Sequence, residues 1–266
     1  MFKKLITTDP YILDTNADGF PIFTQKNLAF LNAVLDIDSN YRDSQDSTDS
    51  NFKNSYAGLL KENGLPNDFD SMEAIVKSID KINSTHLSSE GKLGGNQGIQ
   101  ITTSHILKIN KLEERLSNKD ADIVTLIACA VKNETQNTTH PKNKTNFSFA
   151  TKFCAYSSLH ALNQDNYCIY DKVVQNILPY YAYIYLQDDS YYRTKRTGEN
   201  CSIIKELFQD TVDYKGYRDL IDKIIEAIET DIGLKISYKD FDNLLWYYYK
   251  GTETRIKKAM KLLPTK

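Results

Sequence analysis

The stretch DADIVTLIACAV, residues 120–131, is the part of the chain that decides the fold. Its apolar residues fall on nearly every side of a helix, so an α-helix formed here has no face that prefers water. A helix of this kind is normally buried inside a protein rather than lying on its surface. We therefore predict that residues 120–131 form a central helix against which other helices pack.

Most of the remaining chain also shows helical periodicity. Upstream, Met72, Ile75, Val76 and Ile79 recur at the spacing of one helix face. Apolar residues recur in the same way over seven further ranges: 98–116, 149–162, 172–186, 201–212, 217–232, 240–250 and 253–263. No convincing run of alternating apolar and polar residues, typical of a β-strand, stands out. The predicted fold class is all-α, with two packed helical subdomains.

The boundary between these subdomains is predicted near residue 120. Residues 1–120 would form an N-terminal helical subdomain with polar loops, such as YRDSQDSTDSNFKNS over residues 41–55. Residues 121–266 would form a helical core, although the two parts could also form one continuous domain. The glycine-rich GKLGGNQG, residues 91–98, lacks the ending of a phosphate-binding loop and is interpreted as a linker.

Composition limits the class of protein. The chain has 266 residues, of which 41% are hydrophobic and 26% charged, which is enough for a substantial core. No segment approaches the roughly 18 apolar residues that span a bilayer, and the N-terminus lacks the apolar run of a secretion signal. We therefore expect a cytoplasmic protein without membrane contact. The four cysteines and four histidines form no ligand cluster, so we expect reduced thiols and no metal.

The net charge of −2 argues against indiscriminate binding to nucleic acid. Residues 1–135 are net acidic, however, whereas residues 136–266 are net basic. This polarity fits a binding face on the second part of the chain, and it equally fits a random distribution of surface charge.

The segment NFSFATKFCAYSSLHAL, residues 146–162, places a lysine inside an apolar helix. Lys152 falls near the start of this helix, among Phe149, Phe153 and other apolar side chains. Burial and the positive end of the helix dipole both disfavour a protonated amine, which makes such a lysine more nucleophilic. A neutral lysine amine can attack a sugar C1′ or a carbonyl to form a Schiff base. Periodicity alone favours a simpler alternative, in which the methylenes of Lys152 carry its ammonium out to solvent.

Asp171 ends the short link CIYD, residues 168–171, and opens the predicted helix over residues 172–186. Its simplest role is that of an N-cap, whose carboxylate accepts free backbone N–H groups of the first helical turn. In a reactive site the same carboxylate would stabilise an oxocarbenium-like charge, as carboxylates do when glycosidic bonds are cleaved. Taken alone, Asp171 is better explained as a cap.

Taken together, Lys152 and Asp171 resemble the catalytic pair of the helix-hairpin-helix DNA glycosylase superfamily, most closely its 8-oxoguanine DNA glycosylase branch. In that branch a hairpin ends in a Thr-Lys dipeptide, a helix follows, and the catalytic aspartate precedes the next helix. Here Thr151 and Lys152 match the dipeptide, and Asp171 precedes the next predicted helix. The resemblance implies a helix-hairpin-helix-like element before the Lys–Asp pair, with its turn in the polar connection of residues 133–148.

The resemblance further implies a DNA glycosylase and AP lyase that flips a damaged or modified base out of double-stranded DNA. It assigns Lys152 as the catalytic nucleophile and Asp171 as the catalytic carboxylate, with no cofactor. The residues expected to hold backbone phosphates are Lys142, Lys144, Ser148, Thr151 and Lys172. The candidates for stacking on the base are Phe149, Tyr156 and Trp246. A monomer is the favoured oligomeric state.

Two alternatives stay open on the sequence. Ser148 and Ala150 stand where the family's hairpins usually carry glycines. Those glycines have no side chain, so that their backbone N–H groups can approach a DNA phosphate. This difference favours a catalytically silent nucleic-acid-binding or defence-associated helical module. The other alternative is a helical protein unrelated to nucleic acid, in which Lys152 and Asp171 serve packing and capping.

Overall fold

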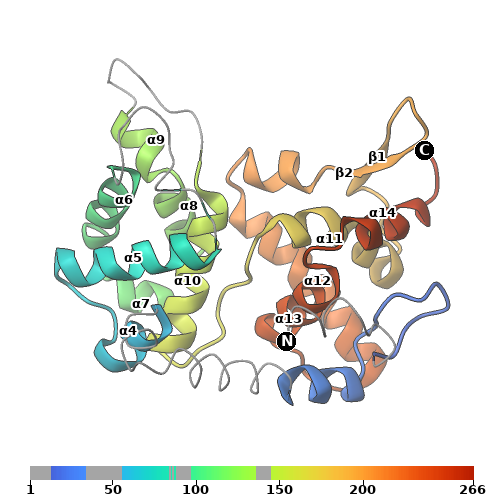
Figure 1. The fold of residues 1–266 in the computed structure, drawn as a ribbon, viewed down its shortest axis with the longest axis horizontal. Helices are drawn as coiled ribbons and strands as arrows, with labels where there is room; N and C mark the ends of the chain where they lie inside the picture. The colour runs from blue at the N-terminus through green and yellow to red at the C-terminus, as the bar shows by residue number, and fades with distance from the viewer. Residues whose placement is uncertain (1–12, 34–55, 84, 86, 88–96, 136–144) are drawn as a thin grey trace. The chain divides into compact units, whose positions relative to one another are not determined.

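The computed structural model describes residues 13–33, 56–83, 85, 87, 97–135 and 145–266. The described part of the chain is mainly helical, which confirms the predicted all-α class (Figure 1). The polar loop expected over residues 41–55 lies outside the described residues, as does most of the expected linker over residues 91–98.

The chain folds into two compact units, each described here by itself. We call them the terminal unit, formed by residues 1–44, 171–207 and 217–266, and the central unit, formed by residues 45–170 and 208–216. This division differs from the boundary near residue 120 that was expected from the sequence. The terminal unit joins the beginning of the chain to its end, which a boundary drawn at one point along the chain does not describe.

The central unit is built from α-helices. Its helices are α4 (Tyr56–Asn63), α5 (Phe69–Asn83), α6 (Gln97–Leu107), α7 (Leu112–Ser117), α8 (Asp122–Ala128), α9 (Ala130–Thr135) and α10 (Phe147–Ala161). Helix α10 packs against α8, α4 and α5. Helix α10 is therefore surrounded by other helices of its own unit.

The predicted central helix over residues 120–131 forms, but as two helices that meet at Cys129. Ile123, Val124 and Ile127 are fully buried, as the apolar pattern predicts. Leu126 is 36% exposed, so one side of α8 does reach solvent. The expectation of a helix buried on all sides is therefore wrong for that side.

The predicted helix over residues 98–116 is also divided. Helix α6 ends at Leu107, and α7 begins at Leu112. Between them Lys111 has a φ angle of 56°, a left-handed conformation that an α-helix cannot continue through. Hydrophobic periodicity does not detect such a break, because the apolar spacing is similar on both sides of it.

The terminal unit contains the long helix α11 (Lys172–Leu186) and the last helices of the chain. These are α12 (Tyr214–Ile232), whose first three residues belong to the central unit, α13 (Tyr238–Tyr249) and α14 (Glu253–Lys261). Residues 25–33 are also helical. The N-terminal segment joins this core through aromatic side chains: the Phe23 ring stacks on Phe241 at 5.4 Å, and the Tyr181 hydroxyl donates to Pro21 O at 2.9 Å.

A short hairpin in the terminal unit was not predicted. Strand β1 (Tyr192–Thr194) pairs antiparallel with β2 (Asn200–Ser202). The predicted helix over residues 201–212 is therefore wrong at its start, and a π-helical turn follows over Lys205–Gln209. Strands of three residues are too short for a period-2 pattern to stand out.

Candidate functional site

Helix α10 carries the candidate nucleophile. The helix forms because most of its apolar residues are buried within the central unit, among them the fully buried Phe149, Phe153 and Cys154. Lys152 lies on its second turn, one turn further along than the sequence suggested, and its side chain faces this interior.

The Lys152 side chain is buried. The residue is 6% exposed, and its Nζ donates a hydrogen bond to Ser148 Oγ at 3.0 Å, one helical turn earlier. The simpler expectation, that the methylenes carry the ammonium to solvent, is therefore wrong. A buried lysine is uncommon because a desolvated ammonium is costly, so this position needs a structural or chemical reason.

Thr151, the other half of the matched dipeptide, has an internal role. Its side chain is fully buried, and its Oγ1 donates to Ser148 O and accepts from the backbone N–H of Tyr170, both at 3.1 Å. A hydroxyl without exposed surface cannot reach a DNA phosphate in this conformation. The expected DNA contact at Thr151 is therefore replaced by a contact that fixes the chain just before Asp171.

Other residues of the central unit hold the same link. The Tyr170 hydroxyl donates to Gln209 Oε1 at 3.1 Å, and the backbone N–H of Cys168 donates to the Tyr214 hydroxyl at 3.0 Å. The chain that leads to Asp171 is thus fastened at both Cys168 and Tyr170. No local pattern in the sequence predicts these contacts, because Gln209 and Tyr214 lie 39 and 46 residues downstream of their partners.

Asp171 caps helix α11, as predicted. Its Oδ1 accepts a hydrogen bond from the backbone N–H of Val174 at 2.9 Å, and the residue itself is extended, with a φ angle of −141°. It is 9% exposed. Asp171 begins the part of the terminal unit that follows Tyr170, whereas Lys152 belongs to the central unit. The structure does not bring the two together within one unit, so their pairing stays a prediction.

The remaining expected phosphate contacts differ in placement. Lys172 is well exposed, with 81% of its side chain accessible, and lies 3.8 Å from Glu253. Ser148 is half-buried and already accepts the hydrogen bond from Lys152. Lys142 and Lys144 lie outside the described residues, together with most of the expected hairpin turn.

The three stacking candidates are not equivalent. Phe149 is fully buried, so its ring belongs to the core and has no surface for a base. Tyr156 is half-buried, but its ring stacks on Tyr56 at 4.4 Å and its hydroxyl donates to Asn83 Oδ1. Trp246, in the terminal unit, is half-buried with the Lys250 ammonium 5.9 Å from its ring centre.

A second nucleophile on α10 can be set aside. Cys154 is fully buried, and burial raises the pKa of its thiol well above its ordinary value. A thiol that stays protonated is a poor nucleophile. Lys152 therefore remains the candidate nucleophile of this helix.

Fold and site together define a mainly helical protein with a buried lysine on an internal helix. The family model HI_0787_N, described as an N-terminal domain, matches residues 31–165. The chain belongs to this family. The matched residues include Lys152 and end before Asp171. No curated protein and no solved structure matches the chain.

Two kinds of feature are missing from the described parts of the chain. No helix among these residues is long and apolar enough to cross a membrane. The same residues contain no group of three or more histidine, cysteine, aspartate or glutamate side chains placed to hold a metal ion.

Proposed function

We propose that the chain is a DNA glycosylase with AP lyase activity, which flips a damaged or modified base out of double-stranded DNA and excises it through Lys152. The observation that carries the proposal is the buried Lys152 side chain, held at Ser148 in the helix whose Thr-Lys dipeptide matches the glycosylase pattern. The dipeptide is also linked to the chain next to Asp171, because the Thr151 hydroxyl accepts a hydrogen bond from the backbone N–H of Tyr170.

The chemistry would begin with an uncharged Lys152 amine. A low-dielectric environment disfavours the ammonium, and the Ser148 hydroxyl fixes the direction of the side chain. The Nζ attacks C1′ of the flipped nucleotide and forms an N–C1′ bond, while the bond from C1′ to the base breaks. The base leaves with the electron pair of that bond and takes up a proton. Opening of the sugar ring then gives a Schiff base between Nζ and C1′.

Asp171 would act as the carboxylate of this reaction. In the proposal it accepts the proton that Nζ loses and stabilises the positive charge that develops at C1′. Loss of a proton from C2′ of the Schiff base would then expel the 3′ phosphate, and water would release the amine. These roles require Lys152 and Asp171 to reach the same nucleotide when DNA is bound.

The test is borohydride trapping on duplex oligonucleotides that carry 8-oxoguanine, an abasic site or no lesion. Borohydride reduces a Schiff base to a stable amine, so the wild-type chain should form a covalent adduct on a damaged duplex. Lys152→Met removes the amine but keeps a long buried side chain, and it should fold normally without forming an adduct. Lys108→Met, at an exposed lysine of the central unit, is the matched control and should trap like wild type.

One observation favours a second candidate, a catalytically silent module that binds double-stranded DNA. The Lys152 amine is buried and hydrogen-bonded, so a substrate must displace its contact with Ser148 before reacting. Salt-dependent retardation of duplex DNA without any adduct would identify this second function. No binding to any duplex would contradict both.

A further inference from the structure

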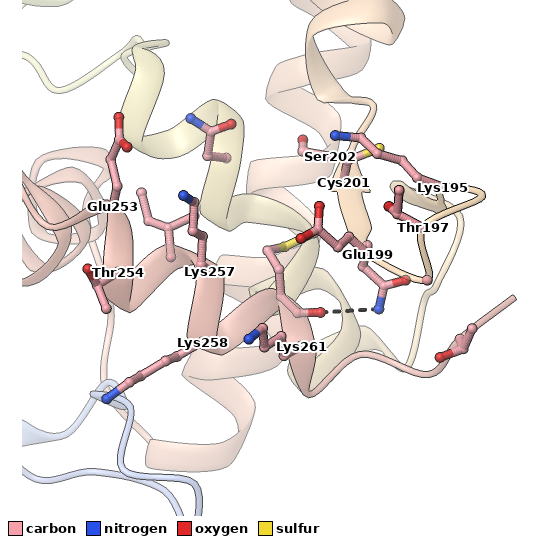
Figure 2. Close-up of a pocket in the computed structure, with 16 residues that line it drawn as sticks. Lys195, Thr197, Glu199, Cys201, Ser202, Glu253, Thr254, Lys257, Lys258 and Lys261 are labelled. Atoms are coloured by element: carbon pink, nitrogen blue, oxygen red, sulfur yellow. Dashed lines mark hydrogen bonds between the residues drawn. The ribbon is translucent and has the colours of Figure 1, made fainter.

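The terminal unit contains a pocket of about 860 Å³ between the β1–β2 hairpin, helix α14 and helix α11 (Figure 2). A volume of this size is in the range of small-molecule binding sites in proteins. Neither Lys152 nor Asp171 lines it. The pocket is therefore separate from the residues used in the proposed excision chemistry.

Lysine side chains surround this pocket from two directions. Lys195 comes from the hairpin, and Lys257, Lys258 and Lys261 come from α14. Figure 2 shows Lys195 on the hairpin side and Lys257 on the α14 side, whereas Lys258 extends away from the hairpin. Lys257 and Lys261 are four residues apart, so they lie on the same face of the helix.

Carboxylates in the lining do not neutralise these lysines. Among the described residues, none of the four lysines forms a salt bridge, although Glu199 and Glu253 also line the pocket. The Glu253 carboxylate lies 3.8 Å from Lys172 instead. Positive charge in the pocket thus exceeds negative charge, and the described residues of the unit provide no salt-bridge partner for these lysines.

Two cations close to the pocket are paired, whereas Arg196, in the hairpin turn, forms no salt bridge with a described residue. Arg193 makes a two-point contact with Glu206, at 2.8 and 2.7 Å, and Lys266 lies 3.4 Å from Asp189. The pocket lysines differ from other unpaired cations of the unit in that several of them line one concave space.

Hydrogen bonds fix the pocket walls to each other. Asn200, on β2, donates from Nδ2 to Met260 O at 3.1 Å, the dashed line in Figure 2, and to Leu263 O at 2.8 Å. The Tyr192 hydroxyl, on β1, donates to Pro264 O at 3.0 Å. The hairpin is thus attached to the end of α14 at several points. Because these walls are already ordered, they lose less conformational entropy on ligand binding than a flexible loop would.

We propose that this pocket binds the phosphate groups of a nucleotide or of a nucleic-acid backbone, through Lys195, Lys257 and Lys261. Ammonium groups that face one concave space without a salt-bridge partner repel each other. A polyanion bound between them attracts each of them and so offsets this repulsion. Lysine binds phosphate as a compact point charge, without the planar geometry that arginine requires. The pocket is larger than one phosphate group, which suits a ligand with several phosphates or with a sugar and base attached.

The proposal does not depend on the excision chemistry, and it holds whether or not Lys152 reacts. The test measures binding of two probes to the full chain by calorimetry at low salt: inorganic tripolyphosphate and a single-stranded thymidine oligonucleotide. The double variant Lys257→Glu and Lys261→Glu should weaken binding at least about tenfold, since hydrogen bonds to charged groups are lost. The charge-preserving variant Lys257→Arg and Lys261→Arg should retain binding.

The matched control is the double variant Lys223→Glu and Lys235→Glu, which makes the same change of net charge at exposed lysines of the terminal unit outside the pocket. It should bind both probes like wild type. Binding of tripolyphosphate alone would identify a small phosphorylated ligand, and binding of the oligonucleotide as well would identify a nucleic-acid backbone. Equal weakening by the pocket and control variants, or no binding of either probe to wild type, would overturn the proposal.

A measurement on the unaltered chain guards against misfolded variants. Tripolyphosphate or the oligonucleotide should protect Lys195, Lys257 and Lys261 from an amine-acylating reagent, as read by mass spectrometry, while Lys223 and Lys235 react as before. Equal protection of all five lysines, or of none, would also overturn the proposal.

Discussion

The Thr151 hydroxyl accepts a hydrogen bond from the backbone N–H of Tyr170 at 3.1 Å. This contact joins the residue before Lys152 to the residue before Asp171. Both groups are buried in the central unit. Lys152 and Asp171 are therefore linked through the residues that precede them, Thr151 and Tyr170, whatever chemistry the pair performs.

Thr151→Val should destabilise the chain. Valine has nearly the same shape as threonine but cannot accept the hydrogen bond, so the buried Tyr170 N–H loses its partner at a cost of about 1–3 kcal/mol. Denaturant unfolding measures this loss. Thr151→Ser keeps the hydroxyl and should cost less, so a serine variant as unstable as the valine variant would show that the hydrogen bond is unimportant.

Substitutions of Asp171 should separate capping from chemistry. Asp171→Ala removes the acceptor for the Val174 N–H and should cost about 0.5–2 kcal/mol of stability. Asp171→Asn should unfold at nearly the same denaturant concentration as wild type, because asparagine caps helices as well as aspartate does. In borohydride trapping, however, Asp171→Asn should form much less adduct, because the amide cannot accept the proton. Full trapping by this variant would assign Asp171 to capping alone.

The cysteines should differ in reactivity. Cys154 and Cys168 are buried, and burial raises the pKa of the Cys154 thiol, whereas Cys129 and Cys201 are half-exposed. Alkylation of the native chain, mapped by mass spectrometry, should therefore modify Cys201 and Cys129 before Cys154 and Cys168. In denaturant all four should react. Rapid native labelling of Cys154 would contradict the burial of the α10 face that carries it.

Alkaline pH should weaken the terminal unit. Burial raises the pKa of Tyr185 to about 12, while in the unfolded chain it returns to the ordinary value of about 10. The native state therefore holds this proton more tightly, so its contribution to stability is complete below about pH 10 and is lost as the pH rises toward 12.

Urea unfolding on both sides of about pH 10 measures this effect. Stability should fall across that range in wild type and fall less in Tyr185→Phe, which has no phenol to ionise. Tyr181 and Tyr249, whose pKa values are also raised by burial, should leave part of the pH dependence in place. An identical pH dependence in both chains would show that Tyr185 does not contribute.

Local patterns predicted what local physics determines. The apolar spacing around residues 149–162 identified helix α10, and the position of Asp171 before an apolar helix identified its cap. Both depend on residues within one or two helical turns, which a single sequence contains. The failed predictions at Cys129, Lys111 and the hairpin depend on where a regular pattern is interrupted.

Contacts between distant residues could not be predicted in this way. The burial of Lys152 depends on which helices pack over it. Helical periodicity alone favours a Lys152 side chain whose ammonium reaches solvent. The terminal unit depends on bonds such as Asn16 Nδ2 to the Tyr180 hydroxyl at 2.7 Å, across more than 160 residues of chain. Neither asparagine nor tyrosine spacing carries a signal for such a partner.

The most direct test of the central claim is to locate the covalent bond. The wild-type chain is trapped with borohydride on a duplex with a damaged base, digested, and its peptides are read by mass spectrometry. The proposal predicts the mass of a reduced sugar fragment on Lys152 and on no other lysine. An adduct on a different lysine, or no adduct on any damaged duplex, would contradict the assignment of Lys152 as the nucleophile.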